Sequence, residues 1–214
     1  MIEFVTVENT AGFRGNPIAE QHKLRYRCVI ERQDWDVPCY NGLEYDEYDN
    51  PVAKYLIYRD ENGIARGLSR FYPTNQPYML EQTFPHFISK IPLPKTDSIW
   101  EGSRYCIDHN ISAKERHTII KELALGYLEM GLYAKIDGIV GLTYPSLWRS
   151  LFINMGWPIE FIGEVTKLEC GRRAQAAWLP VSQEILNNVR DVTGIHQSVL
   201  YLGDNYENEN RTAA

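Results

Sequence analysis

The chain has 214 residues, of which 44% are hydrophobic and 12% aromatic, so it is long enough and apolar enough to bury a core. Its formal net charge of −6 argues against nucleic acid as the main partner, because that partner favours a basic surface. No segment has the length and apolar character of a membrane span, and the first residues lack the pattern of a secretory signal. We therefore expect a cytoplasmic protein without a membrane span.

The four cysteines form neither a CxxC pair nor a disulfide framework, and no histidine cluster accompanies them at the spacing of a zinc site. Reduced thiols and the absence of a metal site are the simplest interpretation. The cysteines are Cys28, Cys39, Cys106 and Cys170.

The first half of the chain is predicted to contain two helices and three strands. Residues 17–33 favour a helix, because Asn16 is a good N-cap and apolar residues recur four apart. The connection that follows is rich in Asp, Asn, Gly and Pro, and its length is uncommon for a loop without a function. Residues 52–59 and 64–73 are then predicted to form a hairpin around DENG. A short amphipathic helix at 79–89 and a strand at 98–107 follow.

The second half of the chain alternates strands and helices. Ser112 and Glu115 form an S-x-x-E capping box, and apolar residues then recur every fourth position up to Gly131, which predicts a helix. The later elements are expected as a strand at 136–143, a helix at 145–155 closed by Gly156, strands at 161–170 and 174–181, and a helix after Ser182.

This order of elements predicts an α/β or α+β fold with a mixed, mostly antiparallel sheet covered by helices. We find no internal repeat and no linker, so residues 1–203 are expected to form a single domain. The tail, residues 204–214, is polar and acidic and is expected to be disordered.

Charged side chains stand inside elements that otherwise look apolar. In the strand 98–107, alternation places Glu101 and Ser103 on one face, and Arg104 on the other face or at a bend. Taken singly, each charged residue has a surface explanation, such as a solvated face, a turn or an edge strand. Together they form a balanced set of three arginines and three acids, and buried charges are rarely found unpaired. The set is Arg25, Asp46, Asp49, Arg70, Glu101 and Arg104.

These residues and their surroundings resemble the LuxI-type acyl-homoserine lactone synthases, the autoinducer synthases. The resemblance is close over residues 20–110 and looser up to the GW pair at 156–157, and it runs through LRYR, Trp35, EYDEYDN, YLIY, RFYPTNQPYML, TFPHF and IWEGSRY. The signature residues of that family fall on the six charged residues above and on Trp35. One departure is Val29, where the family usually carries Phe against the nucleoside, so the adenine side of the pocket is expected to differ.

The resemblance implies an N-acetyltransferase-like fold and a quorum-sensing acyltransferase that makes N-acyl-L-homoserine lactone. S-adenosylmethionine would be the amine donor, a substrate rather than a cofactor, and an acyl thioester on acyl carrier protein or coenzyme A would be the acyl donor. The methionine amine attacks the thioester to form an amide. The carboxylate then displaces methylthioadenosine from the γ-carbon and closes the lactone.

The chemistry implied by the resemblance suggests roles for the signature residues. Glu101 is a candidate general base, directly or through a water, and its alternative role is to pair with a nearby arginine. Arg25, Arg70 and Arg104 can hold the methionine carboxylate, or the two acids of the long connection. Trp35 offers its ring face to adenine or the sulfonium, or else anchors its loop on the core.

The acyl chain is expected to lie between the strand that follows Glu101 and the strand 136–143, with the next helix closing the far end. Plain core packing is the alternative for every wall residue. Two of them, four apart on one helix face, are large aromatic side chains, which favours a short, branched or aryl acyl group. The wall candidates are Met79, Phe84, Ser103, Leu142, Thr143, Trp148 and Phe152.

Because acyl carrier protein is acidic, its docking requires a local basic patch on this acidic chain. Four basic residues after position 148 are candidates, although a solvated face is the commoner meaning of such residues. They are Arg149, Lys167, Arg172 and Arg173.

Three other functions remain open. An N-acetyltransferase that uses acetyl-CoA on another amine would carry a Gly-rich loop for the pyrophosphate, but the junction CIDHNISAKER at 106–116 has no Gly. A methyltransferase that uses S-adenosylmethionine would need a Gly-rich loop after its first strand, which is also missing. A non-catalytic binding domain would have little reason to keep Glu101 and three arginines.

Overall fold

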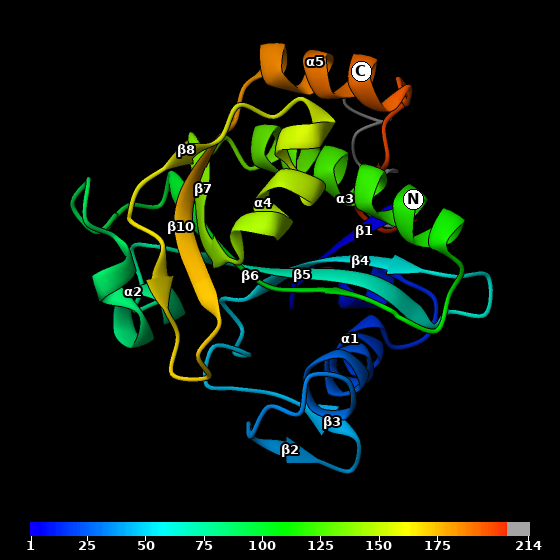
Figure 1. Ribbon diagram of the computed structural model, residues 1–214. Coiled ribbons are helices and arrows are strands. Elements are labelled where there is room, and N and C mark those ends of the chain that lie inside the picture. Colours follow the sequence, from blue (N-terminus) through cyan, green and yellow to red (C-terminus); the bar gives the residue numbers. More distant parts are fainter. Residues whose placement is uncertain (205–214) are drawn as a thin grey trace. The chain divides into compact units, whose positions relative to one another are not determined.

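The computed structural model describes residues 1–204, which form two compact units (Figure 1). Unit 1 comprises Met1–Arg70, Arg104–Gly126 and the described residues from Val199 on, and unit 2 comprises Phe71–Ser103 and Tyr127–Ser198. Three elements contribute residues to both units, namely strands β5 (Ala65–Pro73) and β6 (Ile99–Ile107) and helix α3 (Ala113–Tyr133).

The strands of unit 1 follow the order β11, β1, β4, β5. Strand β1 pairs antiparallel with β4, with Phe4 opposite Leu56, and parallel with β11. Neither β1 nor β11 was expected from the sequence, whereas the β4–β5 hairpin confirms the prediction made from the DENG turn. The bounds are β1 (Ile2–Val5), β4 (Lys54–Arg59) and β11 (Leu200–Tyr201).

Helices cover the strands of unit 1 on both faces. In Figure 1, α1 (Pro17–Arg25) lies on one face of β4 and β5, and the N-terminal part of α3 lies on the other. Helix α1 begins as predicted, because Asn16 accepts a hydrogen bond from the Ala19 amide at 3.0 Å. After Arg25 the chain continues as a π-helical segment, Tyr26–Glu31, and a 3₁₀ turn, Thr10–Gly12, precedes α1.

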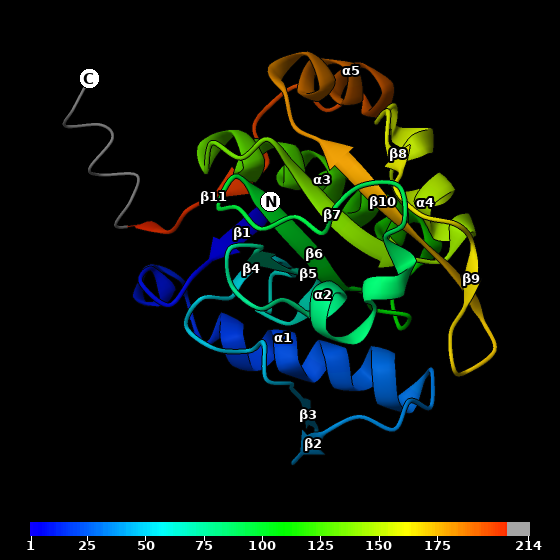
Figure 2. The same ribbon diagram turned by 90° about the vertical axis from the view of Figure 1, so that its left-hand side faces the viewer.

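The long connection after α1 contains a small hairpin of β2 (Cys39–Tyr40) and β3 (Leu43–Glu44). Its turn residues Asn41 and Gly42 have φ angles of 49° and 73°, the left-handed values that a tight two-residue hairpin turn requires. Figure 2 shows the hairpin beside α1. The sequence predicted only an irregular loop here.

The capping box predicted at the start of α3 is present. The Ser112 amide donates to Glu115 Oε2 at 2.9 Å, and the Glu115 amide donates to Ser112 Oγ at 3.2 Å. The helix packs tightly on β5, because a Cβ atom added to Gly67 would lie only 2.4 Å from Ile119 Cγ2.

The strands of unit 2 follow the order β6, β7, β10, β8, and β9 pairs with β10 outside this path. Strands β6 and β7 are parallel, with Glu101 opposite Val140, while β7 and β10 are antiparallel neighbours, as Figure 2 shows. The bounds are β7 (Gly138–Thr143), β8 (Glu160–Phe161), β9 (Thr166–Lys167) and β10 (Arg173–Pro180).

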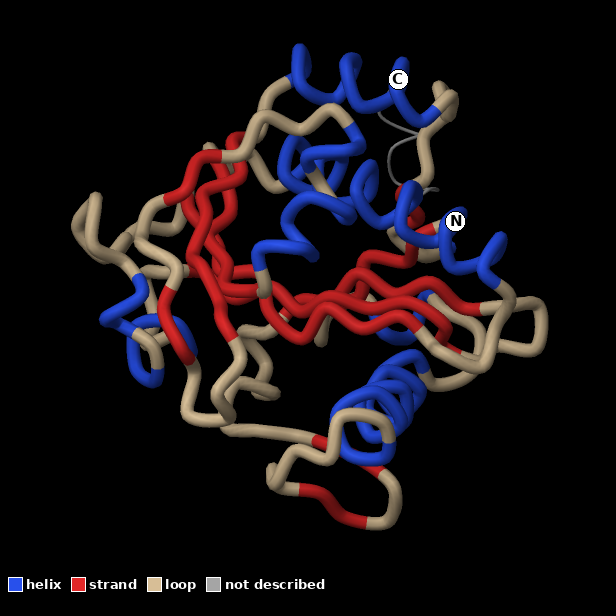
Figure 3. Tube along the Cα trace, viewed as in Figure 1, coloured by secondary structure: helices blue, strands red, loops and turns tan. Residues whose placement is uncertain are grey.

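Apart from its last helix, the helical segments that lie wholly within unit 2 are short; Figure 3 draws the helices in blue. The helix predicted at 145–155 ends earlier, at Leu151, and a 3₁₀ turn then leads to Gly156, which closes it with a φ of 85°. Ser182 caps the last helix by accepting from the Ile185 amide at 3.2 Å. The elements are α2 (Met79–Thr83), a 3₁₀ turn (Pro85–Phe87), α4 (Pro145–Leu151), a 3₁₀ turn (Ile153–Met155) and α5 (Gln183–Thr193).

The strand predicted at 161–170 is largely wrong, because only β8 and β9 form there. The Ile162 carbonyl turns away to accept the amides of Ser89 and Lys90, each at 3.1 Å. Gly163 lies so close to the Phe87 carbonyl that a Cβ atom would be 1.7 Å from its oxygen. The Ile162 amide still donates to the Ala176 carbonyl of β10 at 3.1 Å, but the regular strand pairing is interrupted between β8 and β9.

The structure confirms the predicted fold class, in which helices cover a mixed, mostly antiparallel arrangement of strands. Both units have helices packed on strands. The pairs β1–β11 and β6–β7 are parallel, while β1–β4, β7–β10, β8–β10 and β9–β10 are antiparallel. Within residues 1–204, no helix combines the length and apolar character needed to cross a bilayer. The tail predicted to be disordered lies, from residue 205 on, outside the described residues.

Candidate active site

Six charged side chains of unit 1 form a single buried cluster. Helix α1 and strands β3, β5 and β6 each contribute, as does the loop after β3. Three members have fully buried side chains, namely Arg25, Glu44 and Arg70. The six are Arg25, Glu44, Asp46, Asp49, Arg70 and Arg104, so three positive charges face three negative charges.

Each arginine of the cluster contacts at least two carboxylates. Arg25 Nε donates to Glu44 Oε2, and its Nη1 donates to Asp49 Oδ1 at 2.6 Å. Arg70 donates two hydrogen bonds to Asp46, from Nη1 to Oδ1 at 2.5 Å and from Nη2 to Oδ2 at 3.0 Å. Arg104 Nη2 lies 3.1 Å from Glu44 Oε1 and 2.7 Å from Asp46 Oδ2.

Asp49 accepts hydrogen bonds from three side chains and one main-chain amide. Its Oδ1 accepts from Arg25, from Tyr55 Oη at 2.8 Å and from Arg70 Nη1 at 3.0 Å, and its Oδ2 accepts from the Asp46 amide at 2.8 Å. Burial alone would raise the pKa of Asp49, but the hydrogen bond from Arg25 and the charges of both arginines hold this pKa well below its usual range. Asp49 is therefore ionised at neutral pH.

The same contacts affect the partners of Asp49. Burial alone would lower the pKa of Arg25, but Asp49 and Glu44 outweigh it and raise this pKa. The pKa of Tyr55 is raised by burial and by the adjacent Asp49 carboxylate, so its hydroxyl stays protonated and donates. A buried cluster of this kind is weak evidence for stability, because removing charges from water offsets much of their attraction.

Arg104 occupies a bend in β6. Its φ of 52° is left-handed, which is uncommon for a residue other than Gly and breaks the alternation of a strand. The bend is one of the two positions that the sequence allowed for this residue. With 14% of each side chain exposed, Arg104 and Asp46 are the most accessible members of the cluster. A polar ligand of the cluster would meet these two first.

Val29 and Trp35 follow Arg25 in the chain, and a main-chain hydrogen bond joins them. Val29, in the π-helical segment, is 5% exposed, and its carbonyl accepts the Trp35 amide at 3.1 Å. Trp35 is half-buried. The structure therefore links the main chains of the two residues predicted to contact a nucleoside, and it leaves part of the Trp35 side chain accessible.

Glu101 belongs to unit 2 and is buried, with 2% of its surface exposed. Its carboxylate accepts the main-chain amides at the start of α2, from Met79 at 3.1 Å and from Leu80 at 2.6 Å. Tyr78, at the N-cap position of α2, accepts no hydrogen bond from these amides with its side chain. Glu101, on strand β6, takes the place of such a cap. This link between Glu101 and the first wall residue, Met79, was not predicted.

The wall residues of β7 and α4 form a group. Trp148 and Phe152 are each 3% exposed, and their ring centroids are 5.5 Å apart. Trp148 Nε1 donates to the Gln175 carbonyl at 2.7 Å. The indole lies against Gly141, where an added Cβ would be 3.3 Å from it, and the half-buried Leu142 and Thr143 follow in the chain.

Two aromatic residues that the sequence did not single out extend this group. Tyr127 and Trp157 are buried, and the ring centroid of Phe152 lies 5.5 Å from the first and 5.7 Å from the second. The remaining wall candidates take other positions. Ser103 is buried on β6, while Met79 and Phe84 are half-buried on either end of α2.

Glu44 is the site residue that the sequence analysis missed. It is fully buried and bridges Arg25 and Arg104. Four acidic residues stand within EYDEYD, and nothing in their spacing marks this one as buried. Its position two residues after the NG turn, in a short strand, was the available signal.

The four basic residues proposed for docking an acidic partner are all exposed on unit 2. Arg173 of β10 stands opposite Lys167 of β9 in the strand pairing. Arg172 lies over the Tyr144 ring, with 5.7 Å from its Cζ to the ring centroid, and Arg149 is in the last turn of α4.

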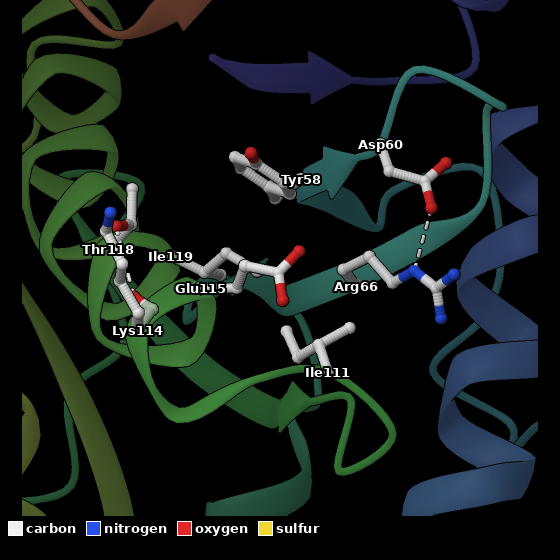
Figure 4. Close-up of a pocket in the computed structure, with 8 residues that line it drawn as sticks. All are labelled: Tyr58, Asp60, Arg66, Ile111, Lys114, Glu115, Thr118 and Ile119. Carbon is white, nitrogen blue, oxygen red and sulfur yellow. Dashed lines mark hydrogen bonds and ion pairs between the residues drawn. The ribbon is translucent and has the colours of Figure 1, made fainter.

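A surface pocket of about 320 Å³ lies elsewhere in unit 1, and Figure 4 shows its lining. Arg66 Nε donates to Asp60 Oδ2 at 2.9 Å at its edge. None of the predicted site residues lines it. The lining residues are Tyr58, Asp60, Arg66, Ile111, Lys114, Glu115, Thr118 and Ile119.

Comparisons with known proteins agree on one family. The family model described as autoinducer synthase matches residues 11–189. An acyl-homoserine-lactone synthase of Vibrio anguillarum is 39% identical over 144 residues, which cover 66% of this chain and 74% of the relative. One of Agrobacterium fabrum is 31% identical over 155 residues, covering 71% of this chain and 73% of the relative.

Solved structures share the fold. The structure of BjaI, a CoA-dependent acyl-homoserine lactone synthase with MTA, gives a TM-score of 0.83 at 22% identity and covers 94% of this chain and 92% of that chain. TofI in a ternary complex with an inhibitor and MTA gives 0.70 at 26% identity, covering 88% of this chain and 95% of that chain.

Proposed function

The chain belongs to the autoinducer synthase family, and we propose that it makes N-acyl-L-homoserine lactone from S-adenosylmethionine and an acyl thioester, releasing methylthioadenosine. The observation that carries this proposal is the buried cluster of three arginines and three acids. Such a cluster is costly to bury and has no role in a plain core, but it suits a substrate whose amino-acid end carries an ammonium and a carboxylate.

The exposure of the cluster refines the roles of its members. Arg25 and Arg70 are fully buried and already hold the acids, so they fix the loop that carries Asp46 and Asp49. Arg104, which is partly exposed, is the arginine we assign to the methionine carboxylate, and its neighbour Asp46 is suited to the ammonium. Trp35 and Val29 are assigned to the nucleoside and the sulfonium.

Two bonds form in the proposed reaction. The ammonium first loses a proton, which Glu101 accepts directly or through a water, a contribution of about 10²–10⁴-fold. The amine nitrogen then attacks the thioester carbonyl, and the carrier thiol leaves. In the second step the methionine carboxylate attacks the γ-carbon, the bond from that carbon to sulfur breaks, and methylthioadenosine departs. Holding both substrates in attack geometry is a further, larger contribution.

The acyl chain is assigned to the wall of unit 2. The pair of Trp148 and Phe152, backed by Tyr127 and Trp157, fills the region behind Gly141 with rings. Bulky rings leave little room for a long chain, which supports a short, branched or aryl acyl group.

The acyl donor is either acyl carrier protein or acyl-CoA. The exposed basic residues of α4, β9 and β10 favour an acidic carrier protein. Some structural relatives are described as CoA-dependent, so both donors belong in the assay. We further propose that the enzyme works in the cytoplasm. The acyl donors are found there, and that compartment keeps free cysteines reduced.

The experiment is mass spectrometry of an organic extract from a bacterial culture that expresses the protein, searched for ions that yield the homoserine-lactone fragment. A Glu101→Ala culture is the control. We expect a lactone series with the wild type and none with the variant. The alternative is an N-acetyltransferase-like enzyme. Purified protein that transfers the acyl group of acyl-CoA to another amine, without releasing methylthioadenosine, would establish this alternative instead.

A further inference from the structure

We propose that the main-chain amides of Met79 and Leu80 position Glu101 for proton transfer, so that the first turn of α2 is part of the catalytic apparatus. This inference rests on the proposed function. It goes beyond that function by assigning a role to backbone groups on the element that also carries a wall residue for the acyl chain.

The hydrogen bonds fix the plane of the carboxylate. Leu80 donates to Oε1 at 2.6 Å and Met79 donates to Oε2 at 3.1 Å, so each oxygen has its own main-chain donor. Two donors on two oxygens restrict rotation about the last side-chain bond of Glu101. The two amides therefore hold the carboxylate in one orientation.

The segment that supplies these amides is itself firmly held. Tyr78 is fully buried and its hydroxyl donates to the Pro94 carbonyl at 3.0 Å. Leu80 is 1% exposed, and Phe87, after α2, packs with its carbonyl against Gly163. Anchors on both sides of α2 keep the two amides in place, as the orientation of a reacting group requires.

Met79 links the two functions of α2. Its amide holds Glu101, while its half-buried side chain is a proposed contact of the acyl chain. The group that accepts the proton and a residue of the acyl-chain wall are therefore both positioned by the first turn of α2. A change in this turn affects the rate of the chemical step as well as the affinity for the acyl donor.

A pair of variants separates the amide from the side chain. Met79→Ala removes the side chain and keeps the N–H, whereas Met79→Pro removes both. Proline fits this position, because Met79 is the first residue of α2 and Tyr78 before it is extended, with φ −121° and ψ 160°. Relative to Met79→Ala, we expect Met79→Pro to lower kcat about tenfold and to displace the acid limb of the pH–rate profile. Equal kcat values and superimposable profiles in two variants with the same Tm would overturn the proposal.

A second measurement does not depend on activity or on the folding of the proline variant. Hydrogen exchange of the Met79 and Leu80 amides is compared between the wild type and Glu101→Gln, with the Thr74 amide, bonded to the Ile99 carbonyl at 3.0 Å, as an internal control. We expect the two amides to exchange about tenfold faster in the variant while Thr74 is unchanged. Unchanged exchange at both positions contradicts the proposal. A wild type that releases no methylthioadenosine would refute the proposed function instead, whatever the exchange shows.

Discussion

The charged cluster of unit 1 and the aromatic group of unit 2 are both buried, but they are held together by different forces. In the cluster, Asp49 accepts four hydrogen bonds, three of them from side chains on α1, β4 and β5. In the aromatic group, rings with centroids 5.5–6.2 Å apart pack by shape. Truncating a charged side chain of the cluster therefore leaves an excess of buried charge, whereas truncating a ring of the aromatic group leaves a cavity. This difference predicts how each region responds to substitution.

The largest effect is expected from Arg25→Met, which keeps most of the side-chain volume but leaves Glu44 and Asp49 without their shared cation. Breaking a buried ion pair in this way costs about 3–5 kcal/mol. The free energy of unfolding in urea is the measurement. On the same helix, Lys23 pairs with Glu20 at 2.7 Å while 51% of its side chain is exposed. The control Lys23→Met should cost less than about 1 kcal/mol, and equal losses in the two variants would contradict our view of the cluster.

The second prediction concerns acid. Because the pKa of Asp49 is lowered in the folded protein, its stabilising contribution is complete above its unfolded pKa and is lost as the pH falls below that value. One such group adds up to about 1.4 kcal/mol per pH unit to the slope of stability against pH. Between about pH 5 and pH 2, the stability of the wild type should fall more steeply than that of Asp49→Asn. Parallel curves for the two proteins would show that the contacts of Asp49 do not control its titration.

In the aromatic group, Trp148→Phe should act on selectivity more than on folding. It removes the hydrogen bond from Nε1 to the Gln175 carbonyl and reduces the ring over Gly141, at a cost of about 1–2 kcal/mol. We expect the lactone products to shift toward longer acyl chains. Trp178→Phe is the matched control, because Trp178 on β10 packs over Gly138 instead. The same product distribution from both variants would remove Trp148 from the acyl wall.

The smallest effect is expected from Tyr55→Phe, which deletes a single hydroxyl. Asp49 then loses one of the three donors on Oδ1, at a cost of about 1 kcal/mol, while the two arginines remain. Tyr58 lies on the same strand and lines the surface pocket, so Tyr58→Phe should change the urea midpoint by less. A larger loss in Tyr58→Phe than in Tyr55→Phe would be inconsistent with the role we give to Asp49.

The two regions also differ in how well the sequence predicted them. Charged residues inside apolar patterns stand out, so five members of the cluster were predicted and the structure brings them together. Glu44 was missed because it is one acid among several in EYDEYD. Aromatic residues carry no comparable signal, since Tyr127 and Trp157 look like any core residue until the fold is known.

The elements of the fold follow a similar rule. Elements with local signals were predicted well, as in the capping box of Ser112 and Glu115. Strand β1 was missed because its partners, β4 and β11, are distant in sequence. The failure at 161–170 has the same origin, since the amides that bind the Ile162 carbonyl belong to residues 89 and 90.

The most direct test of the proposed function is an assay of the purified protein with S-adenosylmethionine and a series of acyl carrier protein and acyl-CoA thioesters. Methylthioadenosine and N-acyl-homoserine lactone are quantified together. We predict that the two products appear in equal amounts with at least one short, branched or aryl donor. No methylthioadenosine with any donor, or methylthioadenosine without lactone, would contradict it.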